Sequence, residues 1–213
     1  MRVIAFMTWA LLGVAGQAPE SAVNRSFLSL SEKQARQTIN GMRVNGQVGG
    51  SWDLRVTSTD RSYNYKLRAT WLTPAAVEAA ARLLQLTKGL GEDQALALVK
   101  EVRAVPAYFL LVELDPREGS GVIPKDWIAR FGPRGAENRQ VVGQVVPEEG
   151  AWRKLVGAFP RDYSYDIFLL KFPAQVEGGR LLFEPADTEA ELVVRIYNKS
   201  GRVRWQTPAD TRK

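Results

Sequence analysis

The segment Asp162-Tyr-Ser-Tyr-Asp-Ile-Phe-Leu-Leu-Lys-Phe-Pro173 decides the fold of this chain. Its first residues alternate between polar and aromatic side chains, whereas Ile167 to Leu170 are apolar on both faces of any extended segment. Such a run is typical of a strand that is covered on both sides, at the centre of a sheet or between packed layers. We therefore predict a layered fold with 162–173 as a central strand.

Three further strands are predicted upstream, because apolar and polar residues alternate over 42–48, 52–57 and 63–71. Gly49-Gly50 supplies a two-residue turn between the first two. The third strand has an aromatic-rich face, made of Tyr63, Tyr65, Leu67, Ala69 and Trp71. At this spacing aromatic side chains lie in a core more often than in a carbohydrate or lipid groove. We expect an antiparallel meander with one wet face and one buried face.

A helical hairpin is predicted over 73–105, where the hydrophobic period changes from strand-like to helical. Thr73 can cap the first helix and Pro74 suits its first turn. Gly89 fits the left-handed position after that helix, and Pro106 ends the second one. A shorter helix is expected over 32–40, with a capping box at its start and Gly41 at its end.

The other elements downstream of the hairpin are shorter. In chain order they are a strand at 107–114, a long connection at 115–127, irregular chain at 128–140, a strand at 140–146, an ambiguous segment at 151–159 that could be a short helix, an edge segment at 181–183, and a final hairpin over 192–205 with its turn at 198–201. Strands therefore come in runs that helices interrupt rather than alternate with. The fold class predicted is α+β, a mainly antiparallel sheet or β-sandwich of about eight strands with an inserted two-helix hairpin.

Residues 1–16 have the pattern of a signal peptide: a short basic start, an apolar run over 3–14, and small residues before Gln17. The apolar run is shorter than the ~20 residues that span a bilayer as a helix. Residues 17–30 are expected to be a flexible N-terminal segment and 31–213 a single globular domain. The sequence thus predicts an exported protein, periplasmic or extracellular, with no transmembrane segment after signal removal.

The chain has no cysteine and a basic balance, with a formal net charge of +6. Without cysteines, an exported domain must be stabilised by its core rather than by disulfides. The basic residues are spread along the chain, and only Arg195, Lys199, Arg202 and Arg204 are locally dense. A nucleic-acid binder should also show a basic stripe or a known motif. The sequence therefore disfavours a nucleic-acid ligand and favours a solvated basic face.

The absence of histidine excludes several reaction mechanisms. It removes Ser-His-Asp and Cys-His nucleophiles, and zinc sites that need histidine or cysteine. The Gly-rich phosphate-binding motifs are missing as well. No catalytic residue, cofactor or metal is predicted.

Carboxylate chemistry remains open, since a glycosidase needs only two acids flanking the bond. Acids that could serve are Asp115, Glu118, Asp126, Asp162 and Asp166. The candidate binding site is the long loop after the strand at 107–114, because rigid sheets often carry functional loops. Its residues are Asp115, Arg117, Glu118, Asp126 and Trp127. The competing interpretation is a solvated loop whose acids pair with nearby bases.

Two functions follow from these observations. The leading hypothesis is an exported, non-catalytic envelope or extracellular protein that binds another macromolecule, either an envelope protein or a polysaccharide. The alternative is a carboxylate-dependent polysaccharide hydrolase. A cleft with two acids roughly 5–10 Å apart would favour the enzyme, and an exposed apolar patch on the helical hairpin would favour the binding protein.

Overall fold

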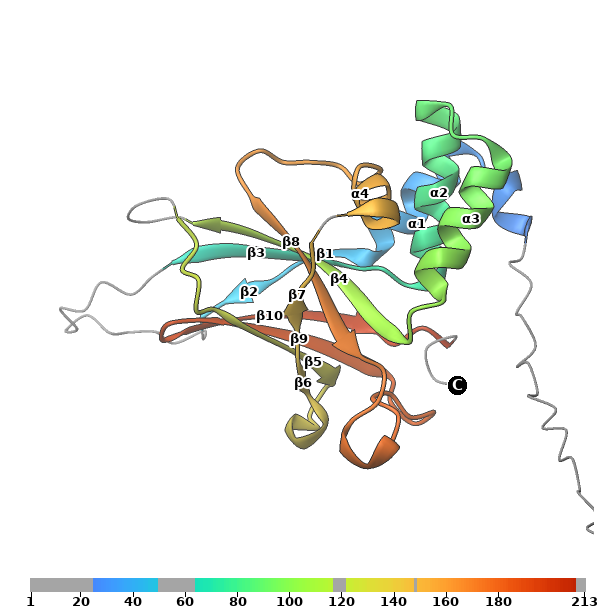
Figure 1. Ribbon diagram of the computed structural model, residues 1–213. Helices are drawn as coiled ribbons and strands as arrows, with labels where there is room; N and C mark the ends of the chain where they lie inside the picture. The colour runs from blue at the N-terminus through green and yellow to red at the C-terminus, as the bar shows by residue number, and fades with distance from the viewer. Residues whose placement is uncertain (1–24, 50–63, 117–121, 148, 210–213) are drawn as a thin grey trace, which may run out of the picture.

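The computed structural model describes residues 25–49, 64–116, 122–147 and 149–209 (Figure 1). Over these ranges the chain forms four α-helices and ten β-strands, arranged in two five-stranded antiparallel sheets. The predicted α+β fold with an inserted helical hairpin is confirmed. The predicted strand at 52–57, residue Tyr63, and the signal peptide lie outside the described residues.

The two sheets lie face to face and are called sheet A and sheet B. Sheet A consists, from edge to edge, of β1 (Arg43–Asn45), β3 (Tyr65–Trp71), β4 (Ala107–Pro116), β8 (Asp166–Pro173) and β7 (Gln144–Val145). Sheet B consists of β2 (Gln47–Val48), β10 (Lys199–Gln206), β9 (Glu189–Ile196), β5 (Ile128–Pro133) and β6 (Val141–Val142). The predicted central strand is therefore β8, between β4 and β7.

The two sheets are joined at both edges, because two short segments pass from one sheet to the other. Residues 43–48 contribute β1 to sheet A and β2 to sheet B, and residues 141–145 contribute β6 and β7 in the same way. Each segment bends at a glycine where an added Cβ would collide with a neighbouring side chain. A Cβ on Gly46 would lie 2.8 Å from the side chain of Leu67, and one on Gly143 would lie 2.6 Å from a buried ring. The sandwich is thus a flattened, closed barrel.

The space between the sheets is filled by a cluster of aromatic side chains. Trp71, which is 1% exposed, lies 5.1 Å from Phe131 and 6.0 Å from Trp205 between ring centroids. The described part of the predicted aromatic face, from Tyr65 to Trp71, points into this cluster. Because these rings meet at edge-on angles and close distances, they form packed core.

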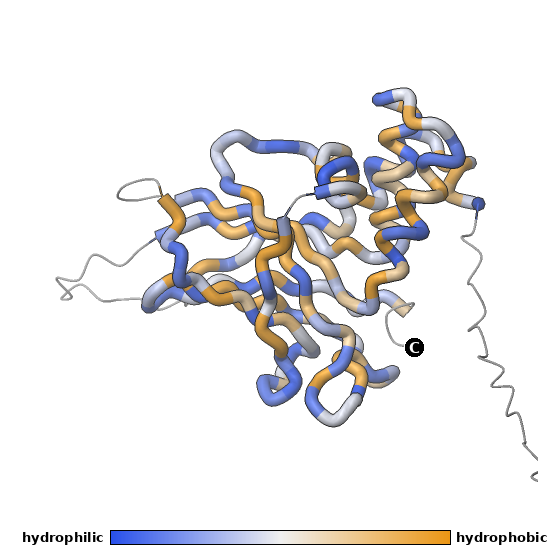
Figure 2. Tube along the Cα trace, in the orientation of Figure 1, coloured by the Kyte–Doolittle hydropathy of each residue, from blue (hydrophilic) through white to orange (hydrophobic). Residues whose placement is uncertain are grey.

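The helices cover part of the outer face of sheet A (Figures 1 and 2). They are α1 (Glu32–Met42), α2 (Pro74–Lys88), α3 (Glu92–Arg103) and the short α4 (Gly150–Val156). Leu111 of β4 and Leu169 of β8 pack against the helices, whereas Leu110 and Leu170 pack between the sheets. Both strands are therefore covered on both faces, as the apolar run at 167–170 predicts.

The helix ends form as the sequence indicates, with one exception. The Ala76 backbone N–H donates to the Thr73 hydroxyl, and Gly89 has a left-handed φ of 70°. Ser31 and Gln34 form the predicted capping box at the start of α1. The exception is Gly41, which lies inside α1 because that helix continues to Met42.

Three predictions about the second half of the chain were wrong. Residues 128–133 are not irregular but form β5, which pairs with β9 along its whole length. Residues 181–183 are not an edge strand, since Leu182 and Phe183 turn inward and are fully buried. The final turn is tighter than expected, because Ile196 pairs directly with Lys199 and leaves Tyr197 at a positive φ of 51°.

The loop after Phe183 is fixed by an ion pair that depends on pH. Both carboxylate oxygens of Asp187 accept hydrogen bonds from Arg139, at 2.6 and 2.7 Å, and one also accepts from the Glu184 backbone N–H. The Arg139 guanidinium, assisted by the Glu184 N–H, lowers the pKa of Asp187 below its usual value. A lowered folded-state pKa means that the stabilisation is present above the unfolded pKa and is lost as the pH falls through the folded one.

Asp187→Asn should therefore lower the free energy of unfolding at neutral pH by about 2 kcal/mol, the usual value for a hydrogen bond to a charged group. The variant should also lose less stability than the wild type as the pH falls below about 4, the ordinary pKa of an aspartate. Urea denaturation at several pH values measures both effects. Parallel stability curves for the two proteins in acid would contradict the assignment.

Candidate functional site

The structure separates the described members of the predicted loop site. Asp115 lies at the end of β4 and its carboxylate is 3.3 Å from the Lys66 ammonium. Asp126 is exposed, whereas Trp127 is half-buried against the ring of Phe168 in the core between the sheets. Arg117 and Glu118 lie outside the described residues. Asp115 and Trp127 belong to different sides of sheet A, so the loop site as a whole stays a prediction.

A buried carboxylate that sequence reasoning did not single out lies on the outer face of sheet A. Glu113, whose side chain is 4% exposed, accepts two hydrogen bonds from Arg43 at 2.6 and 2.9 Å. It accepts two more from Arg68, at 3.0 and 3.1 Å. Arg68 stands directly opposite Glu113 in the β3–β4 register. Both carboxylate oxygens are therefore saturated with charged donors.

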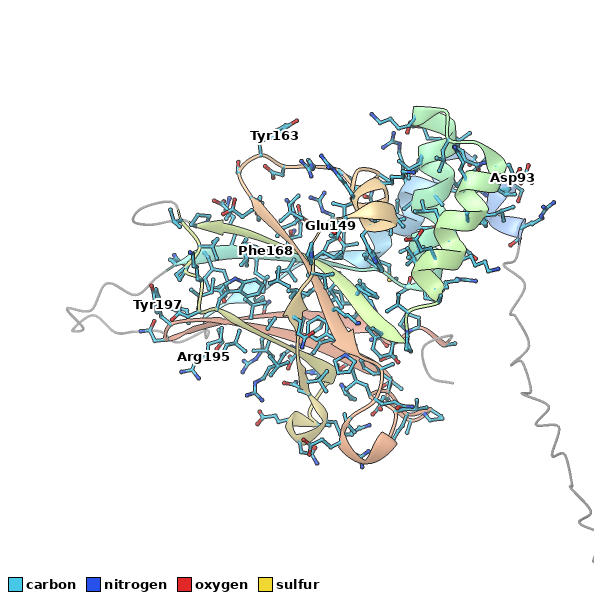
Figure 3. The ribbon with its side chains drawn as sticks, in the orientation of Figure 1. Asp93, Glu149, Tyr163, Phe168, Arg195 and Tyr197 are labelled. Carbon is cyan, nitrogen blue, oxygen red and sulfur yellow. The ribbon has the colours of Figure 1, made fainter. Side chains whose placement is uncertain are left out.

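The same cluster holds the loop that precedes β8. Arg68 also donates to Asp162 at 3.3 Å, and its guanidinium lies 4.2 Å from the centre of the Tyr165 ring. Burial works against the charge of Arg68, but the hydrogen bonds and attraction of Glu113 outweigh it and raise its pKa. Between the two pinned residues the loop presents Tyr163, which points into solvent (Figure 3).

This cluster does not have the properties of a hydrolase site. Two acids do share Arg68, but a general acid needs a raised pKa. The Ser164 backbone N–H, together with Arg68, lowers the pKa of Asp162 instead. The cavity beside Glu113 has a volume of only about 10 Å³, which is room for about one water molecule and not for a sugar ring. We interpret the cluster as a structural clamp.

A second cluster of charge lies on the outer face of sheet B, where strand pairing aligns arginines from three strands. Arg202 of β10 pairs with Val193 of β9, and Val193 pairs with Arg130 of β5. Arg195 lies two residues along β9 from Val193, on the same face. We call Arg130, Arg195 and Arg202 the arginine face. Figure 3 shows Arg195 projecting from β9 on the side of the barrel away from the helices.

The charges of the arginine face are not neutralised within the described part of the chain. Arg130 and Arg202 have no hydrogen bond or ion pair there, and Arg195 donates only to the Tyr197 carbonyl, at 3.1 Å. By contrast, the neighbouring Arg204 is held by Glu191 at 2.8 Å. Three uncompensated guanidinium groups on one flat sheet create a local positive potential.

Exposed apolar side chains flank these arginines. Ile128 of β5 is 45% exposed and Val142 of β6 is 51% exposed, and both share the outer face of sheet B with Arg130. The helical hairpin, in contrast, shows one large exposed apolar side chain in its described residues, Leu86. The surface with features of an interface is therefore sheet B, and the apolar residues of the hairpin mainly form core.

A groove runs along one border of the arginine face, where residues 43–48 cross from sheet A to sheet B. Its volume is about 370 Å³ and most of its lining is polar. The polar side chains come from both sides of the crossing: Asn45, Gln47, Ser200, Arg202 and Arg204. Such a volume falls in the range of small-ligand sites.

The sequence shows only part of this surface. The dense run Arg195, Lys199, Arg202 and Arg204 is visible as composition, and it led to the expectation of a solvated basic face. Arg130 lies far away in the chain and in a segment predicted to be irregular. Its alternation with Ile128, on a strand, is the signal that could have placed it on the same face.

Comparisons of this chain with protein-family models, with curated proteins and with solved structures give no match. In the part of the chain that the structure describes, no helix is long and apolar enough to cross a bilayer, and no group of three acidic residues is suited to hold a metal ion.

Proposed function

We propose that this chain is an exported, non-catalytic binding protein whose ligand is a negatively charged macromolecule. The observation that carries the proposal is the arginine face: three guanidinium groups without acidic partners, aligned across three strands of sheet B. Exposed Ile128 and Val142 add apolar contact area beside them. Export is supported by the composition of residues 1–16.

The alternative of a polysaccharide hydrolase has less support. The acid pair around Arg68 lacks the space that the reaction needs, and the pKa of Asp162 is lowered rather than raised. Of the other candidate acids that the structure describes on sheet A, Asp115 is paired with Lys66, and the exposed Asp166 begins β8 on the opposite face, beside Leu114. Neither has a cavity described beside it.

Binding to dextran sulfate, with neutral dextran as the uncharged reference, tests the proposal. We expect the mature protein to bind the sulfated polymer, and the affinity to fall as salt screens the charges. Replacing Arg130, Arg195 and Arg202 together by glutamine should weaken binding by about 3- to 150-fold, because three exposed ion pairs together contribute about 0.6–3 kcal/mol.

A charge-matched control separates this surface from general basicity. Lys33→Gln, Lys88→Gln and Arg153→Gln remove three exposed positive charges from α1, α2 and α4. The control triple variant should bind dextran sulfate nearly as the wild type does. Equal weakening in the two triple variants, or no binding by the wild type, would refute the proposed surface.

Export is tested separately by the mass of the protein recovered from cells. We expect the protein in the envelope or medium fraction to begin at Gln17, because small residues precede that position. Full-length chain confined to the cytosol would contradict the exported half of the proposal.

A further inference from the structure

The groove beside the arginine face offers hydrogen-bonding groups in addition to positive charge. Asn45 and Gln47 present side-chain amides on either side of Gly46, and both residues are exposed. Neither amide has a hydrogen-bond partner within the described ranges. Each can donate two hydrogen bonds and accept two, so the groove is suited to a ligand rich in hydroxyl groups.

The two arginines of the groove differ in whether an acidic side chain holds them. Arg204 is held by Glu191, whose carboxylate accepts its Nε–H at 2.8 Å, and so it forms a fixed wall. Arg202 has no such partner and stands at the boundary between the groove and the arginine face. A guanidinium group matches the geometry of a carboxylate or phosphate with two parallel hydrogen bonds. One anionic group beside several hydroxyls is therefore the complementary ligand.

We propose that this groove binds one acidic sugar unit of an anionic polysaccharide, with its carboxylate on Arg202 and its hydroxyls on Asn45 and Gln47. The inference rests on the function proposed above and specifies its ligand. Further acidic units of the same polysaccharide extend over Val193 towards Arg130. The two arginine positions are two strand spacings apart, about 10 Å, so a continuous polymer reaches both.

The side chains around the groove argue against a single-stranded nucleic acid. Proteins that bind such strands stack the bases on aromatic rings within a basic groove. Apart from the arginines, the described side chains of the groove and of the sheet between Arg130 and Arg202 are amide, hydroxyl or aliphatic. An acidic protein segment such as polyglutamate would pair with the arginines, but its side chains carry no hydroxyl groups for the two amides.

Three charged polymers distinguish these ligands: polygalacturonate, polyglutamate and a single-stranded oligonucleotide, each titrated into the mature protein by calorimetry. We expect polygalacturonate to bind most tightly. Changing Asn45→Ala and Gln47→Ala together should weaken it about tenfold, as the loss of two hydrogen bonds predicts, and should leave polyglutamate binding unchanged. Gln144→Ala, an exposed amide on β7, is the matched control and should change neither.

The possible outcomes separate the inference from the proposed function. If the three arginines are needed for binding but the Asn45 and Gln47 changes have no effect, the sugar groove is wrong and the binding function stands. Tighter binding of polyglutamate or of the oligonucleotide also overturns the sugar assignment. If none of these polymers binds and dextran sulfate does not bind either, both proposals fail; if dextran sulfate alone binds, only the sugar groove is wrong. Thermal unfolding of each variant checks that the barrel is intact.

Discussion

Glu113→Gln should lower the free energy of unfolding by about 3–5 kcal/mol, the usual cost of breaking a buried ion pair. The Glu113 carboxylate is the common acceptor of Arg43 and Arg68, and both arginine side chains are only 16% exposed. With a neutral amide in its place, two guanidinium groups would face each other with their charge poorly compensated. Urea denaturation at neutral pH measures the loss.

A surface ion pair provides the control for this experiment. Glu32 bonds Arg36 one turn along α1, and both side chains are 52% exposed. Solvent screens such a pair, so Glu32→Gln should cost less than about 0.5 kcal/mol. A Glu113 variant that unfolds within 1 kcal/mol of the wild type would show that the clamp contributes little to stability.

Gly143→Ala should destabilise the protein by about 3 kcal/mol, the upper end of the range for an overpacked core. The new Cβ would lie 2.6 Å from the Phe172 ring, which is fully buried and lies 5.2 Å from Phe131 between ring centroids. The ring therefore has little room to move. The backbone is also held, because the Gly143 N–H donates to the Ala129 carbonyl at 2.9 Å.

A glycine-to-alanine substitution at Gly41 should have the opposite effect on stability. Gly41 is a helical residue of α1, and a Cβ there meets nothing within 4 Å. Alanine is a better helix former than glycine, so Gly41→Ala should stabilise the protein by about 0.5–1 kcal/mol. Melting curves of the two variants, compared with the wild type, test whether Gly143 closes the barrel. Equal effects of the two alanines would contradict that role.

Local elements were predictable where the interactions that stabilise them join residues close together in the sequence. The capping groups at Thr73 and Ser31 bond residues only three positions away, so spacing alone indicates them. The apolar run of β8 is similar, because burial on both faces demands apolar residues at consecutive positions. β5 was missed since Gly132-Pro133 is typical of a loop; here these residues end a strand that is held by β9.

The candidate site was less predictable, because its parts come from distant segments. Arg130 and Arg202 meet across Val193 through strand pairing, and no local pattern encodes that register. In the sequence, Glu113 is the one charged residue of the apolar run 107–114. Its two arginine partners come from β1 and β3, which only the folded sheet brings beside it.

The sequence by itself determined the α+β class, the helical hairpin with its caps, and the doubly covered central strand, because these follow from periodicity and from contacts a few residues apart. The tertiary structure decided that the sandwich closes at Gly46 and Gly143, that the acids of sheet A are clamped, and that uncompensated arginines gather on sheet B. The physical reason is that sheet pairing joins residues far apart in the chain, so the sign and spacing of a surface charge cluster are set by strand order and register.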